Sequence, residues 1–404
     1  MKNNSVNKRY VPKLRFKGFE NNYNKKTIND CFVILNGLSG LKAENFKYGN
    51  DKYIPYKSVF NNWFINNNEL EFFEKGTKKQ NEVTKNDILI TSSSETLNEI
   101  GYSSIYLDNE KVYLNSFCFI LRNISKEVNS QYFNWLMKNK HYRKLIVNEG
   151  QGSTRYNLQK KQFKNIVFNF PLLEEQEKIS KFLNLLDKQI SLLENKLKLT
   201  EQMKKYYLYK MINIGNKFLL RFNEFKDSSI ENSQLASLVK LNKYKQISAS
   251  ELEQLNSKSG NIKLLPSSKD FDWFSDLVDI KDNRVNYGNV ITLGRARYAN
   301  IKKWKGHFIS SNNIIIENNN NVVFDYLYHL INKNKKKFYI EKTTYPVFSS
   351  EIFKEFDCSI PSNINEQIKI SDFLNKIEWI ELHTKNKIEL TKKRKSFYLN
   401  NLFI

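Results

Sequence analysis

The chain has few of the residues on which disulfide-rich, zinc-binding and membrane proteins depend. Its 3 cysteines, Cys31, Cys118 and Cys358, lie far apart and never form a CxxC pair, so the sequence predicts neither a disulfide framework nor a zinc site. We expect free, largely buried thiols in a reducing cytoplasm. No apolar run of about 18 residues occurs, and none follows the basic N-terminus, so we expect a soluble intracellular protein without a membrane span or signal peptide.

Motifs of several enzyme classes are also missing. None of the 6 prolines precedes proline or aspartate, which excludes the Asn-Pro-Pro-aromatic and Pro-Asp motifs. No glycine precedes a lysine and the 13 glycines form no GxGxxG pattern, which excludes a P-loop and a dinucleotide-binding loop. The 4 histidines, His141, His307, His329 and His383, show neither metal-ligand spacing nor a nucleophile partner. We therefore predict no catalytic residue and no metal ligand, and expect any reaction in the biology of this chain to be performed by another subunit.

Positive charge dominates the sequence. The 65 Lys+Arg against 42 Asp+Glu leave a formal net charge of +23 over 404 residues. A field of this strength favours nucleic acid or an anionic surface as partner. A chain rich in lysine and asparagine can equally reflect an AT-rich genome, so the charge by itself leaves the partner open.

A long segment occurs twice. Residues 175–212 return at 366–403, with residue numbers that differ by 191 throughout (367 − 176): EQEKISKFLN matches EQIKISDFLN, and NKLKLTEQMKKYYL matches NKIELTKKRKSFYL. The identical pairs include Gln176/Gln367, Phe182/Phe373, Asn195/Asn386, Thr200/Thr391, Lys204/Lys395 and Tyr207/Tyr398. This repeat predicts a chain built from two structurally equivalent halves.

The two halves also open alike and differ inside. KLRFKGF at 13–19 corresponds to LLRFNEF at 219–225, which pairs Arg15 with Arg221 (221 − 15 = 206). In the interior, NDILITSSSE (86–95) aligns with GNVITLGRAR (288–297), and each places a short apolar run before a turn of small residues. Similar frames around divergent interiors are expected when the interiors read different targets and the frames do the same job.

The repeated segments predict two long helices. In the first copy, apolar residues recur in alternating steps of four and three from Ile179 to Leu197, which is a heptad seam. The second copy has Glu381 and Thr384 at two positions of this seam. The interruption favours two helices of one chain packed on each other over a long homodimeric zipper, and we expect the poorest fit at these two residues.

Each interior is predicted to mix α and β structure. Strands are expected within 111–121, 165–170, 289–293 and 313–317, and helices within 131–147 and 323–333. The expected fold is therefore α+β, with two mixed α/β domains joined by two long helices that pack on each other, and with an internal pseudo-twofold symmetry. The expected boundaries are 1–173 and 213–363 for the domains and 174–212 and 364–404 for the helices.

Together these features resemble the specificity subunit of type I restriction-modification systems. The resemblance lies in VPKLRFKGF at the start, in the frame P-x-x-x-E-Q-x-x-I-S-x-F-L at 171–183, in its second copy at 366–374, and in the turn GSTRYNLQ before the first frame. It implies two target recognition domains, each of which reads one half of a bipartite asymmetric site in double-stranded DNA. The two long helices would then be the conserved spacer, paired antiparallel as a coiled coil.

The same resemblance implies a larger assembly. Two modification subunits, which carry S-adenosylmethionine and methylate adenine, would bind the spacer, and restriction subunits would dock on that core. The specificity chain itself would hold no cofactor and no catalytic residue. One departure from the duplication stands out: the second half has TTYPVFSSEIF (343–353) where the first has GSTRYNLQKKQF, so the contact made there is expected to differ.

Candidate DNA contacts flank the two aligned turns. In the second half, GRARYANIKKWKG (294–306) interleaves basic and aromatic residues after an expected strand, which suits a loop facing a groove of DNA; the alternative is a solvated loop with one buried tryptophan. Its candidates are Arg295, Arg297, Tyr298, Lys302, Lys303 and Lys305. In the first half the candidates are Ser92, Ser93, Ser94, Lys78, Lys79, Arg155 and Tyr156. Arg155 is favoured because Gly150 and Gly152 form a turn that can present it, whereas the lysines of 333–337 suit a solvated helix end or a phosphate contact.

Two other functions stay open from the sequence alone. One is a free-standing, sequence-specific DNA-binding regulator, and the other is a coiled-coil scaffold whose charge reflects genome composition. A neighbouring methyltransferase gene would argue against the regulator. A steep fall of DNA affinity with salt would argue against the scaffold, because phosphate contacts release counterions.

Overall fold

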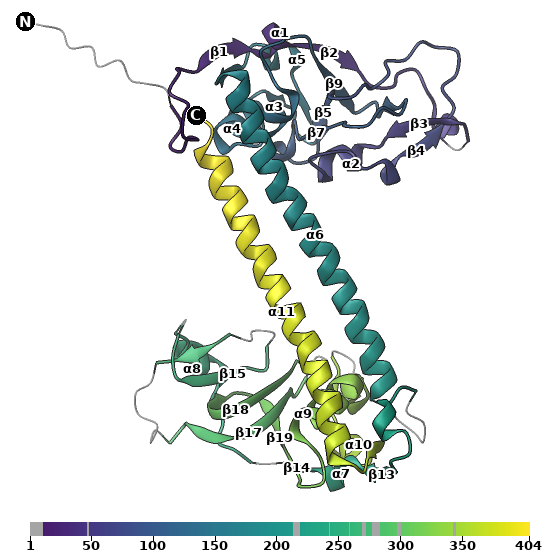
Figure 1. Cartoon of the computed structure of the whole chain (residues 1–404), viewed down its shortest axis with the longest axis vertical. Coiled ribbons are helices and arrows are strands. Elements are labelled where there is room, and N and C mark those ends of the chain that lie inside the picture. Colours follow the sequence, from purple (N-terminus) through teal and green to yellow (C-terminus); the bar gives the residue numbers. More distant parts are fainter. Residues whose placement is uncertain are drawn as a thin grey trace, which may run out of the picture. The chain divides into compact units, whose positions relative to one another are not determined.

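The computed structural model describes residues 11–46, 48–212, 219–241, 243–257, 259–268, 272–276, 283–296, 300–341 and 345–404. The chain forms two compact units: the first runs to Leu193 and includes Lys387–Ile404, and the second is Glu194–Asn386. The long helices α6 (Leu173–Met211) and α11 (Ile364–Asn401) each pass from one unit into the other. Each unit therefore holds one globular α+β part and a portion of both long helices (Figure 1).

The globular part of the first unit is built around a four-stranded antiparallel sheet. Its order is β2 (Phe32–Asn36), β9 (Cys118–Asn123), β5 (Ile88–Thr91) and β7 (Ser103–Ile105). Smaller sheets join β4 (Glu71–Phe73), β3 (Asp51–Ile54) and β8 (Tyr113–Leu114), then β10 (Gly150–Gln151), β11 (Tyr156–Leu158) and β6 (Ser93–Ser94), and finally β1 (Asn24–Thr27) with β12 (Val167–Phe170). The short helices are α1 (Ile28–Cys31), α2 (Tyr56–Asn61), α3 (Ser130–Leu136), α4 (Lys140–Asn148) and α5 (Lys160–Phe163), with 3-10 turns at Ala43–Phe46, Asn67–Glu69 and Leu97–Glu99.

Strand β5 shows why this sheet forms. Its residues Ile88, Leu89 and Ile90 are fully buried, because alternate side chains point to opposite faces of the sheet and both faces are covered. Ile88 and Ile90 enter the core that also holds α3 and the start of α6, whereas Leu89 enters a second core. The apolar run is therefore a central strand with two buried faces.

The second unit contains a six-stranded sheet. Its order is β14 (Val239–Leu241), β19 (Asn313–Asn318), β17 (Asn286–Gly294), β18 (Ile301–Ser310), β15 (Ile262–Leu265) and β16 (Phe274–Ser275). The pairing of β15 with β18 is parallel and the other pairings in this sheet are antiparallel. Two further pairs are β13 (Ile230–Gln234) with β22 (Asp357–Pro361) and β20 (Tyr339–Ile340) with β21 (Val347–Phe348). The helices are α7 (Leu235–Leu238), α8 (Ala249–Gln254), α9 (Phe324–Asn334) and α10 (Ser350–Lys354), with 3-10 turns at Asn223–Phe225 and Lys335–Phe338.

Two of the expected elements are divided by polar residues. The strand expected within 111–121 is two strands, because the chain turns at Asn115, whose side chain accepts a hydrogen bond from the N–H of Phe117 at 2.8 Å. The helix expected within 131–147 is α3 followed by α4, because Asn139 interrupts it and caps α4 through the N–H of His141 at 2.8 Å. In both places the asparagine offers the backbone an alternative to continuing the element.

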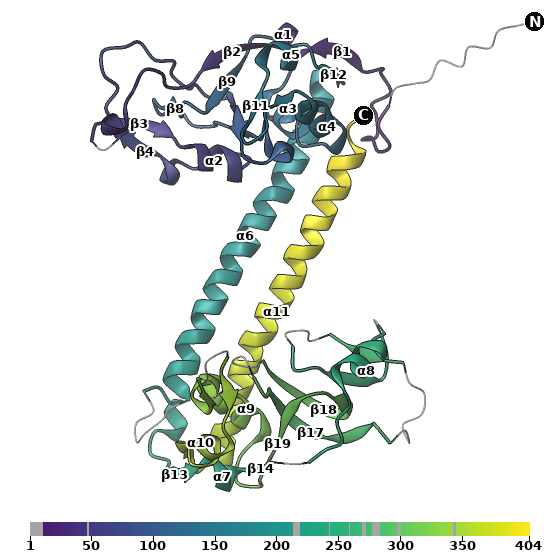
Figure 2. The same cartoon turned by 180° about the vertical axis from the view of Figure 1, so that it is seen from behind.

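The long helices pack on each other in the same way within each unit. In the first unit, the ring of Phe182 meets that of Tyr398 at 4.8 Å and 89°. In the second, the ring of Tyr207 meets that of Phe373 at 4.8 Å and 84°. Figures 1 and 2 show α6 and α11 running antiparallel, as the family resemblance implied.

The two interruptions of the seam are accommodated by different means. Glu381 accepts a hydrogen bond from Lys204 on α6 at 3.1 Å and from Lys385 one turn further along α11 at 2.5 Å. Thr384 is short enough to be buried at this packed surface, with 5% of the residue exposed. A polar seam position is therefore filled by an ion pair in one case and by a small side chain in the other.

Candidate nucleic-acid interface

The repeated Glu-Gln pair anchors each globular part to the long helices. In the first unit, Arg15 donates two hydrogen bonds of 2.8 Å to the carboxylate of Glu175, which is buried. In the second, Arg221 donates two hydrogen bonds to Glu366 at 2.8 and 2.5 Å. The matching openings and the matching helices of the two halves thus form one bidentate ion pair in each unit. Each pair joins the opening segment of its half to the start of a long helix.

The glutamine of the same pair ties the globular part to the start of each long helix. The Gln176 side chain accepts from the N–H of Asn129 at 2.9 Å and donates to the carbonyl of Pro171 at 2.9 Å. Gln367 accepts from the N–H of Val323 at 2.8 Å and donates to the carbonyl of Pro361 at 2.8 Å. Asn129 and Val323 are the N-caps of α3 and α9, so each glutamine fixes a helix of its own unit.

The aligned turns of the two interiors end in equivalent strand pairings. In the first unit, Ser94 of β6 pairs with Tyr156 of β11. In the second, Ala296 forms a bridge with Val347 of β21. The numbers differ by the offsets of the repeat (296 − 94 = 202 and 347 − 156 = 191), which confirms the alignment of 86–95 with 288–297.

In each unit an arginine lies at this strand pair, but on different strands. In the first unit it is Arg155, next to β11, and in the second it is Arg295, at the position that corresponds to β6. The carbonyl of Arg295 accepts a hydrogen bond from the N–H of Phe348 at 3.0 Å, so Arg295 stands where Ser93 pairs with Asn157 in the first unit. The position of Arg155 is occupied by a proline in the second unit (155 + 191 = 346). The two edges therefore present different side chains on the same backbone arrangement.

In the first unit, the predicted residues Ser93, Ser94 and Arg155 line one pocket of about 250 Å³, which we call the Arg155 pocket. Arg155 is exposed and its guanidinium lies 5.2 Å from the ring centre of Phe117. The turn that presents Arg155 requires glycine, because Gly152 has φ +138° and a Cβ there would lie 2.1 Å from the carbonyl oxygen of Arg155. Gly152 thus lies in the turn that carries Arg155, whereas Gly150, the other predicted turn residue, lies in β10, and the DNA contact of Arg155 stays a prediction.

The serines are less available than the sequence predicted. Ser93 and Ser94 are buried in β6, and Ser92 donates from its hydroxyl to the carbonyl of Phe117 at 2.7 Å. The expected turn is a short strand instead, since β6 is held between β11 and the core. Most of this segment is therefore engaged in hydrogen bonds within the unit and is not free to contact a groove of DNA. Tyr156, the neighbouring candidate, is half-buried in β11.

In the second unit, the expected groove-facing loop is largely a strand. Lys302, Lys303 and Lys305 lie in β18, which is paired along its length with β17. Lys302 is buried and donates to the carbonyls of Pro266 and Ser268. The prediction of a DNA contact by Lys302 is therefore wrong, because its ammonium group is held inside the unit by backbone oxygens.

The other two lysines of β18 are held by one carboxylate. Lys303 donates to Asp325 at 2.7 Å and to the side chain of Asn375 at 2.7 Å, and Lys305 donates to Asp325 at 3.0 Å. These bonds join β18 to α9 and α11 within the second unit. Lys303 is thus committed to a structural contact, whereas Lys305 keeps half of its side chain exposed.

The remaining candidates lie on exposed loops or outside the described residues. Lys78 and Lys79 are exposed in the segment after β4, and Arg295 is exposed at the end of β17. Arg297 and Tyr298 lie outside the described part of the chain. In the run 333–337, Lys333 donates to the carbonyls of Tyr209, at 3.1 Å, and Ile212, so its ammonium group is engaged within the unit, whereas Lys336 and Lys337 are exposed.

Sequence reasoning missed the aromatic walls of the Arg155 pocket. Tyr56 and Phe60, one turn apart on α2, face each other with ring centres 5.9 Å apart. Phe117, in a run predicted to be one strand, is 48% exposed at the turn between β8 and β9. Only the tertiary packing of α2 against β5 and β7 brings these rings together, and no local pattern in the sequence indicates it.

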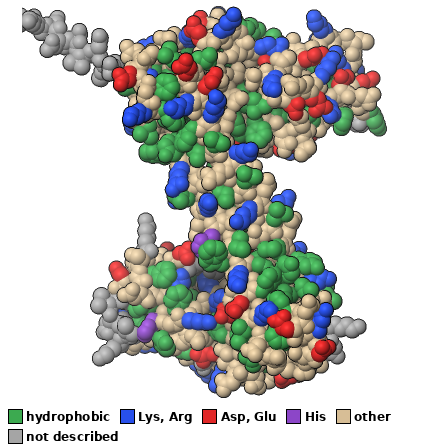
Figure 3. All heavy atoms as spheres, viewed as in Figure 1, with side chains coloured by type: hydrophobic (Ala, Val, Ile, Leu, Met, Phe, Trp, Pro, Cys, Tyr) green, Lys and Arg blue, Asp and Glu red, His purple; other side chains and the backbone are tan. Residues whose placement is uncertain are grey.

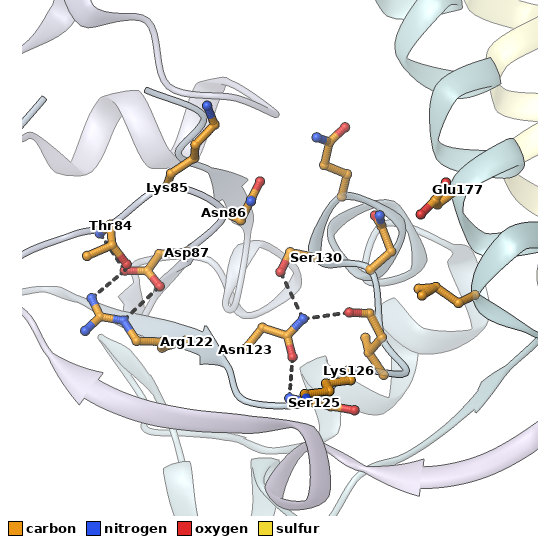
Figure 4. Close-up of a pocket in the computed structure, with 14 residues that line it drawn as sticks. Thr84, Lys85, Asn86, Asp87, Arg122, Asn123, Ser125, Lys126, Ser130 and Glu177 are labelled. Atoms are coloured by element: carbon orange, nitrogen blue, oxygen red, sulfur yellow. Dashed lines mark hydrogen bonds and ion pairs between the residues drawn. The ribbon is translucent and has the colours of Figure 1, made fainter. Parts of the chain in front are cut away.

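A second groove of the first unit, of about 560 Å³, is lined by polar residues, and its buried carboxylate, Asp87, is paired with an arginine of the same groove. Figure 4 shows Asp87 at its edge, held by Arg122 at 2.7 and 3.1 Å and by the N–H of Thr84 at 2.8 Å. Lys85 and Lys126 also border it. Because its one buried carboxylate is already paired, this groove offers less to a base edge than the Arg155 pocket does.

The surface charge is mixed over both globular parts. On the face drawn in Figure 3, lysine and arginine side chains alternate with acidic ones over each unit. None of the described helices is both long and apolar enough to cross a membrane. Within the described residues, no group of three or more His, Cys, Asp or Glu side chains could hold a metal ion. The candidate interface therefore depends on individual residues at the two equivalent edges.

Comparison with known proteins agrees with this arrangement. The family model described as the type I restriction modification DNA specificity domain matches residues 20–202 and 228–392. The chain is similar over 98% of its length to 99% of the S subunit of a type I restriction-modification system from M. genitalium, with a TM-score of 0.69 and 16% identity. It is also similar, over 94% of its length and 97% of the other chain, to a structure described as the basis of complex assembly and conformational transition of the type I R-M system, with a TM-score of 0.50 and 10% identity. With two matches that together cover most of its sequence, the chain belongs to the family of non-catalytic DNA specificity subunits of type I restriction-modification systems.

Proposed function

We propose that each unit reads one half of a bipartite, asymmetric site in double-stranded DNA. The observation that carries this proposal is the pair of equivalent strand edges, Ser93–Ser94 with β11 and Arg295–Ala296 with β21, which have the same backbone pairing and different side chains. Readers of the same construction that must recognise different bases would differ in this way, because base edges are read by side chains and not by the backbone. The predicted contacts that fit this proposal are Arg155 in the first unit and Arg295 in the second, with Lys78, Lys79, Lys305 and Tyr156 beside them.

The long helices and the buried ion pairs at their ends would form the assembly platform. We propose that they bind two modification subunits, which carry S-adenosylmethionine and methylate adenine, and that restriction subunits dock on that core. The repetition supports this part of the proposal, because the Arg15–Glu175 and Arg221–Glu366 pairs fix the chain around the start of a long helix in the same way in each unit. The assembly would act in the cytoplasm, where the host chromosome and invading DNA are both accessible.

Methylome sequencing tests the proposal in cells. Strains that express the modification subunit with and without this chain would be compared for N6-methyladenine. The proposal predicts one asymmetric motif with two specified halves, which is present only when the chain is expressed. Methylation that is independent of the chain, or a motif with a single specified half, contradicts it.

A binding measurement with purified components tests the stoichiometry. Co-expression should give a complex of two modification chains per specificity chain, and its affinity for the motif should fall steeply with salt because phosphate contacts release counterions. A chain that binds the motif tightly and ignores the modification subunit would instead be a regulator.

A further inference from the structure

The Arg155 pocket has two acidic side chains, although a surface that binds DNA is expected to be positively charged. Glu95 and Glu99 both line it, next to Ser94 and Arg155. Among the described residues, neither carboxylate forms an ion pair. Close to phosphates such a carboxylate is repelled, so its presence at a DNA-reading edge weakens binding unless it meets a hydrogen-bond donor on a base.

Glu99 is the better oriented of the two carboxylates. It is half-buried in the 3-10 turn Leu97–Glu99, whereas Glu95 is exposed. The Ser94 hydroxyl accepts from the N–H of Thr96 at 3.1 Å, which leaves its proton to be donated to Oε2 of Glu99 at 3.4 Å. No hydrogen bond to Oε1 is present within the described part of the chain. One carboxylate oxygen is thus held by the protein and the other can accept from a ligand.

The walls of the pocket favour a flat, partly apolar group. Tyr56 uses its hydroxyl to donate to the carbonyl of Ser93 at 2.8 Å, so its ring serves as a wall. Phe60 stacks between Tyr56 and Tyr102, with ring centres 5.9 and 5.0 Å away. Half-exposed Phe117 closes the side below Arg155. Apolar walls keep water away from the carboxylate and so strengthen a hydrogen bond made to it.

We propose that Glu99 is a specificity-determining residue that accepts a hydrogen bond from the exocyclic amino group of an adenine or cytosine in the major groove. These amino groups, N6 of adenine and N4 of cytosine, are the donors that bases present there, and a carboxylate oxygen can accept from them, as Glu and Asp do from N4 of cytosine. Thymine and guanine present O4 or O6 at the same place, and an oxygen against a carboxylate is repulsive. Arg155 at the rim would offset the charge of Glu99. This inference rests on the proposed function of the first unit as the reader of one half-site.

The second unit has no counterpart of this device among its described residues. Its equivalent edge carries Arg295 in place of Ser93, and an arginine donor suits the O6 and N7 acceptors of guanine. The two half-sites should therefore differ in the chemical class of base at the equivalent position: one that donates for the first unit, and one that accepts for the second.

Binding selection from randomised DNA tests the role of Glu99. The full chain in complex with its modification subunits would be compared with the Glu99→Gln variant, whose amide keeps an acceptor and adds a donor. Wild type should prefer adenine or cytosine over guanine or thymine at one position of one half-site, by about 5- to 100-fold. Because its added donor can meet O4 or O6, Glu99→Gln should lose the rejection of guanine and thymine at that position alone. Glu74→Gln, which removes the same charge from an exposed loop of the first unit outside the pocket, should read DNA as wild type does.

A base analogue separates a hydrogen bond from an indirect effect. Where the selected base is adenine, duplexes in which it is replaced by purine lacking the 6-amino group should bind wild type about tenfold more weakly. A Glu99→Leu variant, whose side chain has no acceptor, should show no such loss. Urea unfolding of the first unit serves as the folding control, because a misfolded first unit would lose its half-site while the second unit still reads the other. Unchanged base preference in Glu99→Gln overturns this inference and leaves the two-unit proposal standing. Absence of any sequence preference in wild type overturns the proposed function itself.

Discussion

Arg15 and Glu175 form a bidentate ion pair whose carboxylate is almost fully buried, with side-chain exposures of 14% and 1%. Tyr23 also points its hydroxyl at Glu175, at 3.5 Å. Removal of one partner of such a pair leaves an uncompensated buried charge, which costs about 3 kcal/mol or more. Arg15→Met should therefore lower the free energy of unfolding of the first unit by about that amount in urea denaturation.

The double variant Arg15→Met/Glu175→Gln separates the pair from its surroundings. With the carboxylate neutralised as well, the loss should be clearly smaller than for Arg15→Met alone, because no buried charge is left unpaired. Lys13→Met, at an exposed position in the same segment, should change little. An equal loss in the single and the double variant would mean that the packing of the arginine stem, and not the ion pair, holds this segment.

The two glutamines of the repeat allow a test of independence between the units. Gln176→Ala removes the acceptor for the N–H of Asn129 and should destabilise α3 by about 1–3 kcal/mol. Gln367→Ala should do the same to α9 through Val323. Native-state hydrogen exchange of the amides in α3 and α9 measures each effect, and Gln202→Ala on the exposed face of α6 is the control. Exchange that accelerates in both helices in either variant would contradict separate anchoring.

Much of the frame could be predicted from the sequence because it obeys local rules. Heptad spacing fixes which face of α6 is buried, and Ile179, Leu183 and Ile190 are buried as the seam requires. The correspondence between the pairing of Ser94 with Tyr156 and that of Ala296 with Val347 also agrees with the alignment of the halves. Because the openings and the long helices each occur twice in the sequence, their patterns could be recognised by comparing the two copies.

The side chains at the candidate interface could not be predicted in the same way. Lys302 has the sequence context of a groove-facing residue, yet it is buried because Pro266 and Ser268, far away in the chain, supply carbonyl acceptors. Glu99 and Phe117 have no local signature at all, since the pocket that joins them is formed by tertiary packing. Burial and pairing of a charged residue depend on such distant partners, whereas helix periodicity does not.

The stability of the two units should depend differently on pH, because equivalent asparagines of the two halves face a tryptophan in the first unit and a histidine in the second. Asn184 accepts from the indole N–H of Trp135 at 2.7 Å in the first unit, and Asn375 (184 + 191) meets Nε2 of His329 at 2.9 Å in the second. Burial lowers the pKa of His329 to about 4, below its ordinary value of 6.5. The unfolded chain therefore binds a proton more readily, and the stability of the second unit is complete above pH 6.5 and falls as the pH drops toward 4.

The expected loss for His329 is about 2 kcal/mol at pH 5 relative to pH 7, from a difference of 1.36 kcal/mol per pKa unit. Urea unfolding at both pH values measures it. His329→Gln keeps a donor for Asn375 and does not titrate, so the pH dependence of this variant should be flatter by the same amount. A variant as acid-sensitive as wild type would assign the effect to other groups.

Modularity of DNA reading is tested by two arginines at equivalent edges. Arg295→Ala should weaken base preference in one half-site, and Arg155→Ala in the other half-site, each by about tenfold, since one good base contact is worth about 1–3 kcal/mol. Selection from randomised DNA measures both. Arg394→Ala, which removes an exposed arginine from α11, is the control for lost charge. Equal losses at both half-sites in either edge variant would contradict the assignment of one unit to each half.

The start and the end of the described chain meet in the same way as the inner junction between the halves. The N–H of Leu14 donates to the carbonyl of Asn401 at 2.8 Å, and the N–H of Leu220 donates to the carbonyl of Lys210 at 3.1 Å. The residue numbers differ by the two offsets of the repeat, 220 − 14 = 206 and 401 − 210 = 191, so the two junctions are equivalent. The inner junction is continuous in the chain, whereas the outer one is made by contacts between the two ends.

A chain that is opened between Ile212 and Leu219 and joined at its original ends by a short glycine-serine linker should therefore keep every described contact of both units. We expect a urea midpoint close to that of wild type and the same target motif, whereas a chain opened within β9, between Ile120 and Leu121, should not fold because it interrupts a central strand. Loss of the motif in a folded permuted chain would show that the covalent order of the halves, and not their packing, determines which bases are read.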